Sequence, residues 1–251
     1  MLAGLTPETF ALLVLAAFLA GFIDAIAGGG GLVTIPALLI GGVDPISALG
    51  TNKLQSLFGS GSASLAYAAK GHVDLRKLAP TALCSFAGAM LGALGALFLP
   101  TDVLETLLPF LLIAIALYFA FKPGLSDLDA ERRVSPAFFV GFLVPLIGAY
   151  DGLFGPGTGS FFMLAFVTLA GYGILKATAH TKLLNFASNV GGFVVFAASG
   201  SVLWTLGLAM GAAQFAGARI GAAFAMRFGA KLIRPLLVTV CLALAAKLLL
   251  G

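Results

Sequence analysis

Two aspartates and two lysines lie inside long apolar stretches of this sequence: Asp24 and Lys53 in the first half, and Asp151 and Lys182 in the second. Charged groups are costly inside a membrane, so those that occur there are functional candidates by default. A glycine-rich run follows each aspartate, and each lysine lies in the apolar stretch after that run. The pattern predicts a polar site that is built twice from the same kinds of residue.

The composition indicates that these apolar stretches cross a membrane. Hydrophobic residues make up 60% of the 251 residues, charged residues only 10%, and the mean hydropathy is +1.09. This excludes a soluble globular domain, in which about 25% of the residues are charged. Because a membrane-spanning helix needs about 20 mostly apolar residues, we expect an all-α polytopic membrane protein with about 8–10 membrane segments.

Each glycine run interrupts an apolar stretch and predicts a broken or re-entrant helix. The runs comprise Gly28, Gly29, Gly30 and Gly31 in the first half, and Gly155, Gly157 and Gly159 in the second. Backbone N–H groups freed by such a break are tolerated at membrane depth only where they face protein or a water-filled cavity. A helix that resumes after the break presents its positive end there, which suits an anion. We therefore predict that these glycines, together with Thr158, bind substrate.

Close packing of helices is the alternative use of glycine in membrane segments. It is the interpretation that we prefer for Gly88 and Gly92, and for Gly217 and Gly221. For the two dense runs we prefer the binding interpretation, because packing needs fewer glycines. The phosphate-binding loop of nucleotide enzymes is excluded, since no Gly-Lys-Ser/Thr follows either run.

A polar stripe accompanies each lysine. Residues four apart share one face of a helix, and polar side chains recur at this spacing around Lys53 and Lys182. Such a stripe lines a cavity or a helix contact, so interhelical hydrogen bonding with the lysines extended toward an interface is an alternative. A cation beside hydrogen-bonding groups suits an anion. The predicted substrate-binding residues are Thr51, Asn52, Lys53, Gln55 and Ser56 in the first half, and Thr181, Lys182, Asn185 and Asn189 in the second.

Asp24 and Asp151 occupy equivalent places before the two runs, and three roles are open to them. They could pair with Lys53 and Lys182, or they could cap a helix. They could also carry a proton coupled to transport, since burial favours the protonated form of a carboxyl group.

The two halves of the chain repeat one plan. An offset of 129 residues relates Lys53 to Lys182, and the same offset relates the Phe-Ala-Gly-Ala sequences at 86–89 and 215–218. We expect a first transmembrane repeat over 1–121, a cytoplasmic linker over 122–134 and a second repeat over 135–251. Basic residues gather in the loops 70–77, 122–133 and 227–234, which the positive-inside rule places in the cytoplasm. The two repeats are then inverted, which is typical of many secondary transporters.

Two motifs carry a resemblance to a known family. The first is D-A-I-A-G-G-G-G-L-V-T-I-P-A-L-L from Asp24, and the second is G-T-N-K-L-Q from Gly50; G-P-G-T-G and H-T-K-L-L-N-F-A-S-N are their degenerate copies. With these motifs, essentially the whole chain resembles the TauE/SafE family of membrane permeases, or sulfite exporters. The resemblance implies a multi-pass protein of the prokaryotic cytoplasmic (inner) membrane that moves sulfite, sulfonates or other organosulfur anions. The half-sites differ, because His180-Thr181 replaces Thr51-Asn52.

We therefore predict a secondary transporter with a central anion site at the repeat interface, and not an enzyme. An anion channel is the nearest alternative. An intramembrane serine protease that uses Ser160 and His180 is a remote one, disfavoured because the motif is duplicated. The expected partners are the small anion and the lipid bilayer, with a homodimer left open. Nucleic acid is excluded, because the net charge of +4 falls in a few loops. No catalytic residue, cofactor or metal site is expected.

Overall fold

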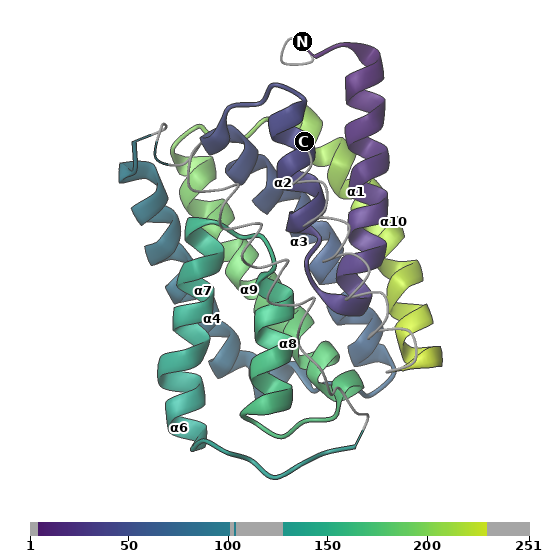
Figure 1. Cartoon of the computed structure of the whole chain (residues 1–251), viewed down its shortest axis with the longest axis vertical. Helices are drawn as coiled ribbons and strands as arrows, with labels where there is room; N and C mark the ends of the chain where they lie inside the picture. The colour runs from purple at the N-terminus through teal and green to yellow at the C-terminus, as the bar shows by residue number, and fades with distance from the viewer. Residues whose placement is uncertain (1–4, 101–102, 104–127, 230–251) are drawn as a thin grey trace.

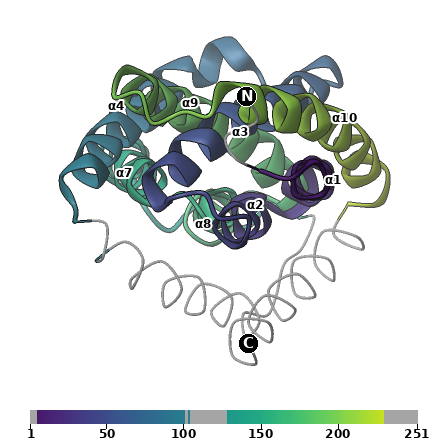
Figure 2. The same ribbon diagram turned by 90° about the horizontal axis from the view of Figure 1, so that it is seen from above.

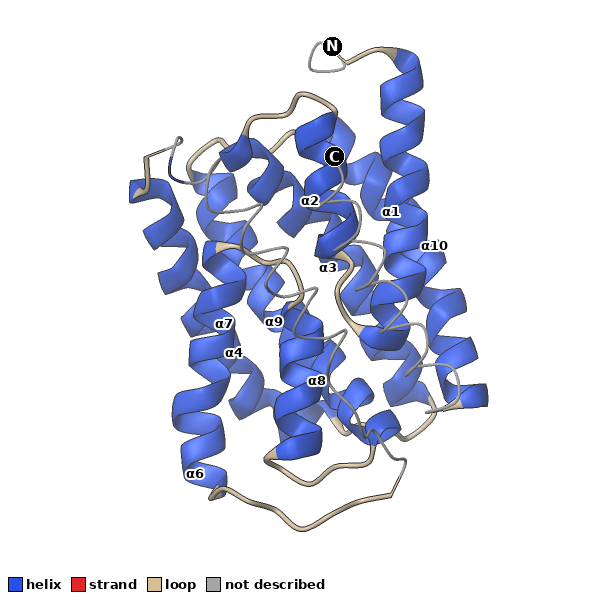
Figure 3. Cartoon of the chain, in the orientation of Figure 1, coloured by secondary structure: helices blue, strands red, loops and turns tan. Residues whose placement is uncertain are grey.

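The computed structural model describes residues 5–100, 103 and 128–229 (Figure 1). The described residues form helices joined by turns and loops, and they contain no strand (Figure 3). The expected all-α class is therefore confirmed. Two predicted membrane segments, near 103–121 and 235–250, lie outside the described residues apart from Val103.

The first half contains α1 (Pro7–Ala27), α2 (Gly31–Ile40), α3 (Pro45–Ala69) and α4 (Leu75–Phe98). Helix α3 begins at Pro45 because Asp44 caps it, with a carboxylate that accepts the Ser47 N–H at 3.0 Å. Asp74 caps α4 in the same way. Helix α4 consequently starts inside the predicted loop 70–77 and not after it.

The second half contains α6 (Pro136–Phe138), a π-helical turn η1 (Phe139–Leu143) and α7 (Val144–Leu153), which follow one another without interruption. Helices α8 (Thr158–Thr168), α9 (Ile174–Ala198) and α10 (Trp204–Phe228) follow. The second break is shorter than the predicted 155–159, because Thr158 and Gly159 already belong to α8.

Short helices follow both breaks. Three described helical stretches are long and apolar enough to cross a membrane: Pro7–Ala27, Leu75–Phe98 and Pro136–Leu153. In contrast, α2 has 10 residues and α8 has 11, which at about 1.5 Å per residue is roughly half the thickness of a bilayer core. From the middle of Figure 1, α2 extends upward and α8 downward. The prediction that each glycine run breaks a helix is confirmed.

Helices from opposite halves pack closely against each other. A Cβ atom added to Gly88 would lie 2.1 Å from the Pro145 carbonyl oxygen of α7, and one added to Gly92 would lie 1.9 Å from that of Ala149. Gly217 and Gly221 of α10 approach backbone carbonyls of α1 in the same way, at 2.0 and 2.3 Å. The packing interpretation of these glycines is confirmed.

Corresponding helices in the two halves have matching lengths and opposite directions. The 25-residue helices α3 and α9 start 129 residues apart, at residues 45 and 174, and α4 and α10 start the same distance apart, at 75 and 204. In Figure 1, α3 runs downward and α9 upward. Seen from above, α2 and α8 overlap between α1 and α7, with α3 and α9 alongside (Figure 2). This arrangement brings both breaks to the centre.

Candidate functional site

The two glycine breaks contact each other at the centre of the molecule. Gly28 and Gly29 have φ angles of 73° and 105°, and Gly155 and Gly157 have φ angles of 90° and 79°, a region that favours glycine. A Cβ atom on Gly28 would lie 2.4 Å from the carbonyl carbon of Gly159. Glycine is therefore needed here both for the turn and for the approach of one backbone to the other.

Asp24 caps the first break. Its Oδ1 atom accepts the N–H groups of Gly29 and Gly30, each at 3.1 Å, just before α2 begins. The carboxylate thus satisfies donors at the positive end of α2. Of the three roles open to Asp24, helix capping is present in the structure.

Both lysines pair with the aspartate of the other half. Lys53 Nζ of α3 lies 2.8 Å from Asp151 Oδ1 of α7 and also donates to the Asp151 carbonyl oxygen. Lys182 Nζ of α9 lies 3.1 Å from Asp24 Oδ2 of α1 and donates to the Asp24 carbonyl oxygen. These side chains are 0–7% exposed. The two pairs therefore connect the halves through buried charges, whose loss costs far more than that of a surface pair.

A small polar cavity lies between the breaks. Its volume is about 10 Å³, which is room for about one water molecule. Every residue that lines it was predicted from the sequence as a binding or coupling residue: Asp24, Gly29, Gly30, Gly31, Asn52, Ser56, Asp151, Gly155, Gly157, Thr158, Gly159, Asn185 and Asn189. A ligand of several heavy atoms therefore does not fit unless the breaks separate.

Unused hydrogen-bond donors line this cavity. Asn52 Oδ1 accepts from the Thr34 hydroxyl at 2.6 Å and from Gln55 Nε2 at 2.9 Å, which leaves the amino group of Asn52 for the cavity. Asn185 Oδ1 accepts from Asn189 Nδ2 at 3.3 Å. Within the described residues, no acceptor binds the amino groups of Asn52 and Asn185 or the hydroxyl of Ser56. The cavity is therefore suited to a ligand with several acceptor oxygens.

The remaining predicted binding residues lie behind the cavity wall. Lys53 and Lys182 bind the aspartates, Gln55 orients Asn52, and the Thr51 hydroxyl accepts the N–H of Leu203 at 3.0 Å. Thr181 is buried, and its Oγ1 atom has no hydrogen-bond partner among the described residues. Gly28 forms the contact between the breaks.

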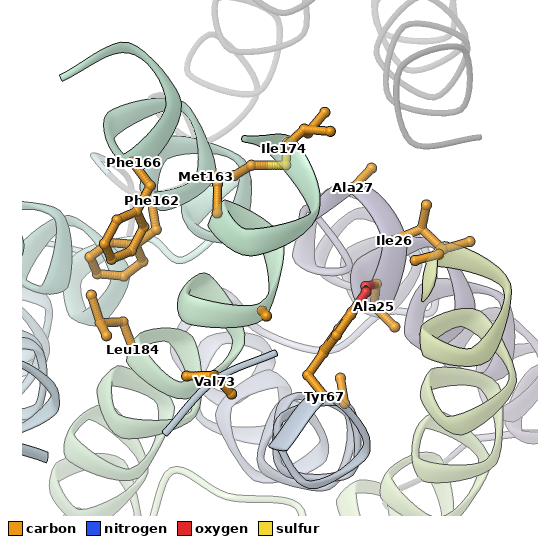
Figure 4. Close-up of a cluster of buried hydrophobic side chains, with 14 of the residues drawn as sticks. Ala25, Ile26, Ala27, Tyr67, Val73, Phe162, Met163, Phe166, Ile174 and Leu184 are labelled. Atoms are coloured by element: carbon orange, nitrogen blue, oxygen red, sulfur yellow. The ribbon is translucent and has the colours of Figure 1, made fainter. Parts of the chain in front are cut away.

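Sequence reasoning missed three residues that hold the site in place. The Thr34 hydroxyl also lies 3.1 Å from the Gly30 carbonyl oxygen, so it joins the first break to Asn52. Tyr67 reaches from α3 to donate to the Ala25 carbonyl oxygen at 2.9 Å, beside the apolar cluster in Figure 4. Tyr150 donates to the Pro156 carbonyl oxygen at 2.5 Å. For Thr34 and Tyr150 the only available signal was their position near the breaks in the sequence, and Tyr67, near the end of α3, gave none.

Ser160 and His180 do not form the hydrogen-bonded pair that a serine protease needs. The Ser160 hydroxyl donates to the Ala27 carbonyl oxygen at 3.0 Å. His180 Nδ1 lies 2.8 Å from the Lys176 carbonyl oxygen, and its ring packs against Phe166 and Tyr172. Each side chain thus bonds to a backbone carbonyl group instead of to the other. The described residues also contain no group of His, Cys, Asp or Glu that could hold a metal ion.

Comparison with known proteins gives a consistent result. The family model described as "Sulfite exporter TauE/SafE" matches residues 13–248. A probable membrane transporter protein, ORF9, from Sinorhizobium sp. is 65% identical over 95% of this chain and 92% of its own length. The probable membrane transporter protein YfcA of Escherichia coli K12 is 46% identical over 97% of this chain and 91% of its own length. No solved structure matches the chain.

Proposed function

The chain belongs to the TauE/SafE family of membrane transporters, and we propose that it moves a small anion through the central cavity. Sulfite, a sulfonate or another organosulfur anion is the proposed substrate class. The single observation that supports an anion best is the set of unused donors on Asn52, Asn185 and Ser56. Their amino and hydroxyl groups match the several acceptor oxygens of a sulfur oxyanion.

We propose that two inverted repeats form this site and move relative to each other. The repeats are residues 1–121 and 135–251, joined by the cytoplasmic linker 122–134. The opposite directions of α3 and α9 and their offset of 129 residues support this division. In such transporters, half-helices meet near the middle of the bilayer, and one repeat rocks against the other around the site.

The crossed ion pairs, Lys53–Asp151 and Lys182–Asp24, join the two halves. Moving the halves apart therefore costs free energy, which a bound anion can offset. Separating the breaks enough to admit an oxyanion moves α1 and α7, which carry Asp24 and Asp151, relative to α9 and α3, which carry their lysine partners. A buried lysine that loses its carboxylate needs another anion. The substrate can take that place, and this would couple opening of the cavity to substrate binding.

Exchange across a membrane tests the proposed function. Purified protein in liposomes loaded with unlabelled methanesulfonate should accumulate labelled methanesulfonate, and the exchange should saturate with concentration. Unlabelled sulfite and methanesulfonate should compete, whereas dimethyl sulfone, a neutral molecule of similar shape, should not. Equal competition by dimethyl sulfone would contradict an anion site. A flux that rises linearly with concentration and carries a sustained current would favour the channel alternative.

A further inference from the structure

The two aspartates of the central site do not have the same surroundings. Both carboxylate oxygens of Asp24 are partnered: Oδ1 accepts the N–H groups of Gly29 and Gly30, and Oδ2 lies 3.1 Å from Lys182 Nζ. Three donors, two from the first break and one from α9, therefore bind this carboxylate. Nothing in this arrangement leaves an oxygen free to take up a proton.

Asp151 has one unpartnered oxygen. Its Oδ1 atom lies 2.8 Å from Lys53 Nζ, but its Oδ2 atom is buried and accepts no hydrogen bond from any described residue. The side chain is 2% exposed and lines the cavity. A buried carboxylate oxygen without a donor is costly, and a proton on that oxygen removes the cost.

The second break does not supply the donors that the first one does. The Gly155 N–H donates to the Tyr150 carbonyl oxygen at 3.3 Å, and both the N–H and the hydroxyl of Thr158 donate to the Gly155 carbonyl oxygen, at 3.3 and 2.8 Å. These groups are therefore engaged within the break. The asymmetry follows from sequence, since Pro156 and Thr158 interrupt the second glycine run.

The net charge of the site makes the unpartnered Oδ2 atom of Asp151 important for anion binding. The ionisable groups that face Asp151 are Lys53 of α3, Tyr150 of α7, and the Asp24–Lys182 pair of α1 and α9 near the cavity. The described parts of α2, α4 and α8 contribute no further acid or base there. Two lysines and two aspartates sum to zero. An anion that enters then adds an uncompensated negative charge next to the bare Oδ2 atom.

One proton on Asp151 removes this conflict in two ways. It converts Oδ2 from an acceptor, which repels an anion oxygen, into an O–H donor that can bind one. It also weakens the hold of Asp151 on Lys53. The Lys53 ammonium lies against the second break, since a Cβ atom added to Gly155 would be 3.0 Å from Nζ. The released cation is thus already beside the cavity.

We propose that Asp151 is the residue that takes up one proton together with each anion, and that Asp24 is a permanently ionised helix cap. This inference rests on the proposed anion transport. The step is balanced: the carboxylate of Asp151 gains one proton, one monovalent anion enters, and the net charge of the site stays zero. Transport of a monovalent anion with its proton is then electroneutral. The two halves of the site therefore have different roles: proton uptake at Asp151 and helix capping at Asp24.

Proton uptake on anion binding tests this assignment. Methanesulfonate is the probe, because a sulfonate does not itself titrate near neutral pH. Adding it to weakly buffered wild-type protein in detergent should remove about one proton per bound anion from solution. Its affinity should fall about tenfold per pH unit as the pH rises through the range in which unliganded Asp151 is ionised.

Matched substitutions separate the two carboxyl groups. Asp151→Asn keeps the size of the side chain and should bind methanesulfonate with no proton uptake and no pH dependence, whereas Asp151→Glu should retain both. Asp24→Asn, if it folds, should still take up a proton; if it does not fold, its role as a cap is supported and the Asp151 variants decide the question. Proton uptake by Asp151→Asn equal to that of the wild type would overturn the proposal. Wild-type protein that binds methanesulfonate without a proton would overturn it too, whereas no anion binding at all would contradict the proposed function instead.

Discussion

Removing the cation of one crossed ion pair should destabilise the protein strongly. Lys53→Met deletes the ammonium group but keeps an unbranched apolar side chain of similar length. It leaves the carboxylate of Asp151, only 2% exposed, without its counter-charge. Breaking a buried pair by removing one partner costs about 3–5 kcal/mol. We expect a loss of unfolding free energy in this range, because the Asp151 carbonyl oxygen loses its donor as well.

The chain offers a matched control for this prediction. Lys176 pairs with Asp129 at a shorter distance, 2.6 Å, but the two side chains are 44% and 54% exposed. A surface pair contributes about 0–1 kcal/mol, so Lys176→Met should cost no more than that. Burial, and not distance, thus determines the expected difference between these two lysine substitutions.

The assay is equilibrium unfolding in detergent of the wild type, the two single variants and Lys53→Met/Asp151→Asn. The double variant removes both charges of the buried pair, so it should be more stable than Lys53→Met alone. Equal losses for Lys53→Met and Lys176→Met would show that burial does not determine the cost of removing the cation. A double variant that is no more stable than Lys53→Met would show that the uncompensated carboxylate is not the cause.

Three further outcomes are expected. Gly92→Ala should lower the yield of folded protein, because the added Cβ atom would lie 1.9 Å from a backbone carbonyl oxygen. Gly95→Ala should not lower it, because the nearest atom to its Cβ would be 3.5 Å away, on a leucine side chain. Equal yields would contradict the packing of α4 on α7. If the repeats are inverted, a membrane-impermeant thiol reagent added to whole cells should label Ser201→Cys, but it should label Leu75→Cys only after the membrane is permeabilised. Labelling of both variants in intact cells would exclude inversion. The Gly173 N–H and Lys176 hold the pKa of Asp129 below its usual 3.8, so these two contacts are present above about pH 4 and are lost as the pH falls through the lowered pKa. Because the Ala130 and Arg133 N–H groups still bind the carbonyl oxygens of Gly171 and Leu169, we expect only local loosening, so limited proteolysis next to Asp129 should be faster in acid than at neutral pH, and an equal rate would contradict this.

Much of the helix pattern could be predicted because local signals fix it. Asp44-Pro45 marks the start of α3, and Ser135-Pro136, a capping serine followed by proline, marks the start of the second half. The glycine runs identify both breaks. The start of α4 is harder to predict, because charged residues such as Arg76 and Lys77 are typical of loops. Asp74 nevertheless caps the helix that contains them.

The pairing of the charges could not be obtained in this way. Each half contributes one aspartate and one lysine to the site, so pairing within a half and pairing between halves satisfy the sequence equally well. The choice depends on which helices face each other across the centre, and helical period does not report this. The structure places Lys53 on Asp151 and Lys182 on Asp24, so the lysines reach the cavity only through their partners.

The cavity wall was easier to predict than the groups behind it. A polar side chain inside an apolar helix is conspicuous, and Asn52, Ser56, Asn185 and Asn189 all line the cavity. Thr34 was overlooked because a single threonine in an apolar segment commonly bonds to its own helix. Its contact with Asn52 depends on how α2 folds back onto α3, which is a tertiary property.

Equilibrium binding to two serine variants can show whether the transported anion binds in the polar cavity between the two breaks. Ser56 and Ser60 are both buried and lie one turn apart on α3, but only Ser56 lines the cavity; Ser60 donates to the Ser56 carbonyl oxygen at 2.6 Å. A hydrogen bond to a charged ligand is worth about 1.5–3 kcal/mol. Ser56→Ala should therefore weaken the binding of methanesulfonate by about tenfold or more, and Ser60→Ala should leave it unchanged. Equal effects of the two substitutions, or an effect of Ser60→Ala alone, would place the anion elsewhere.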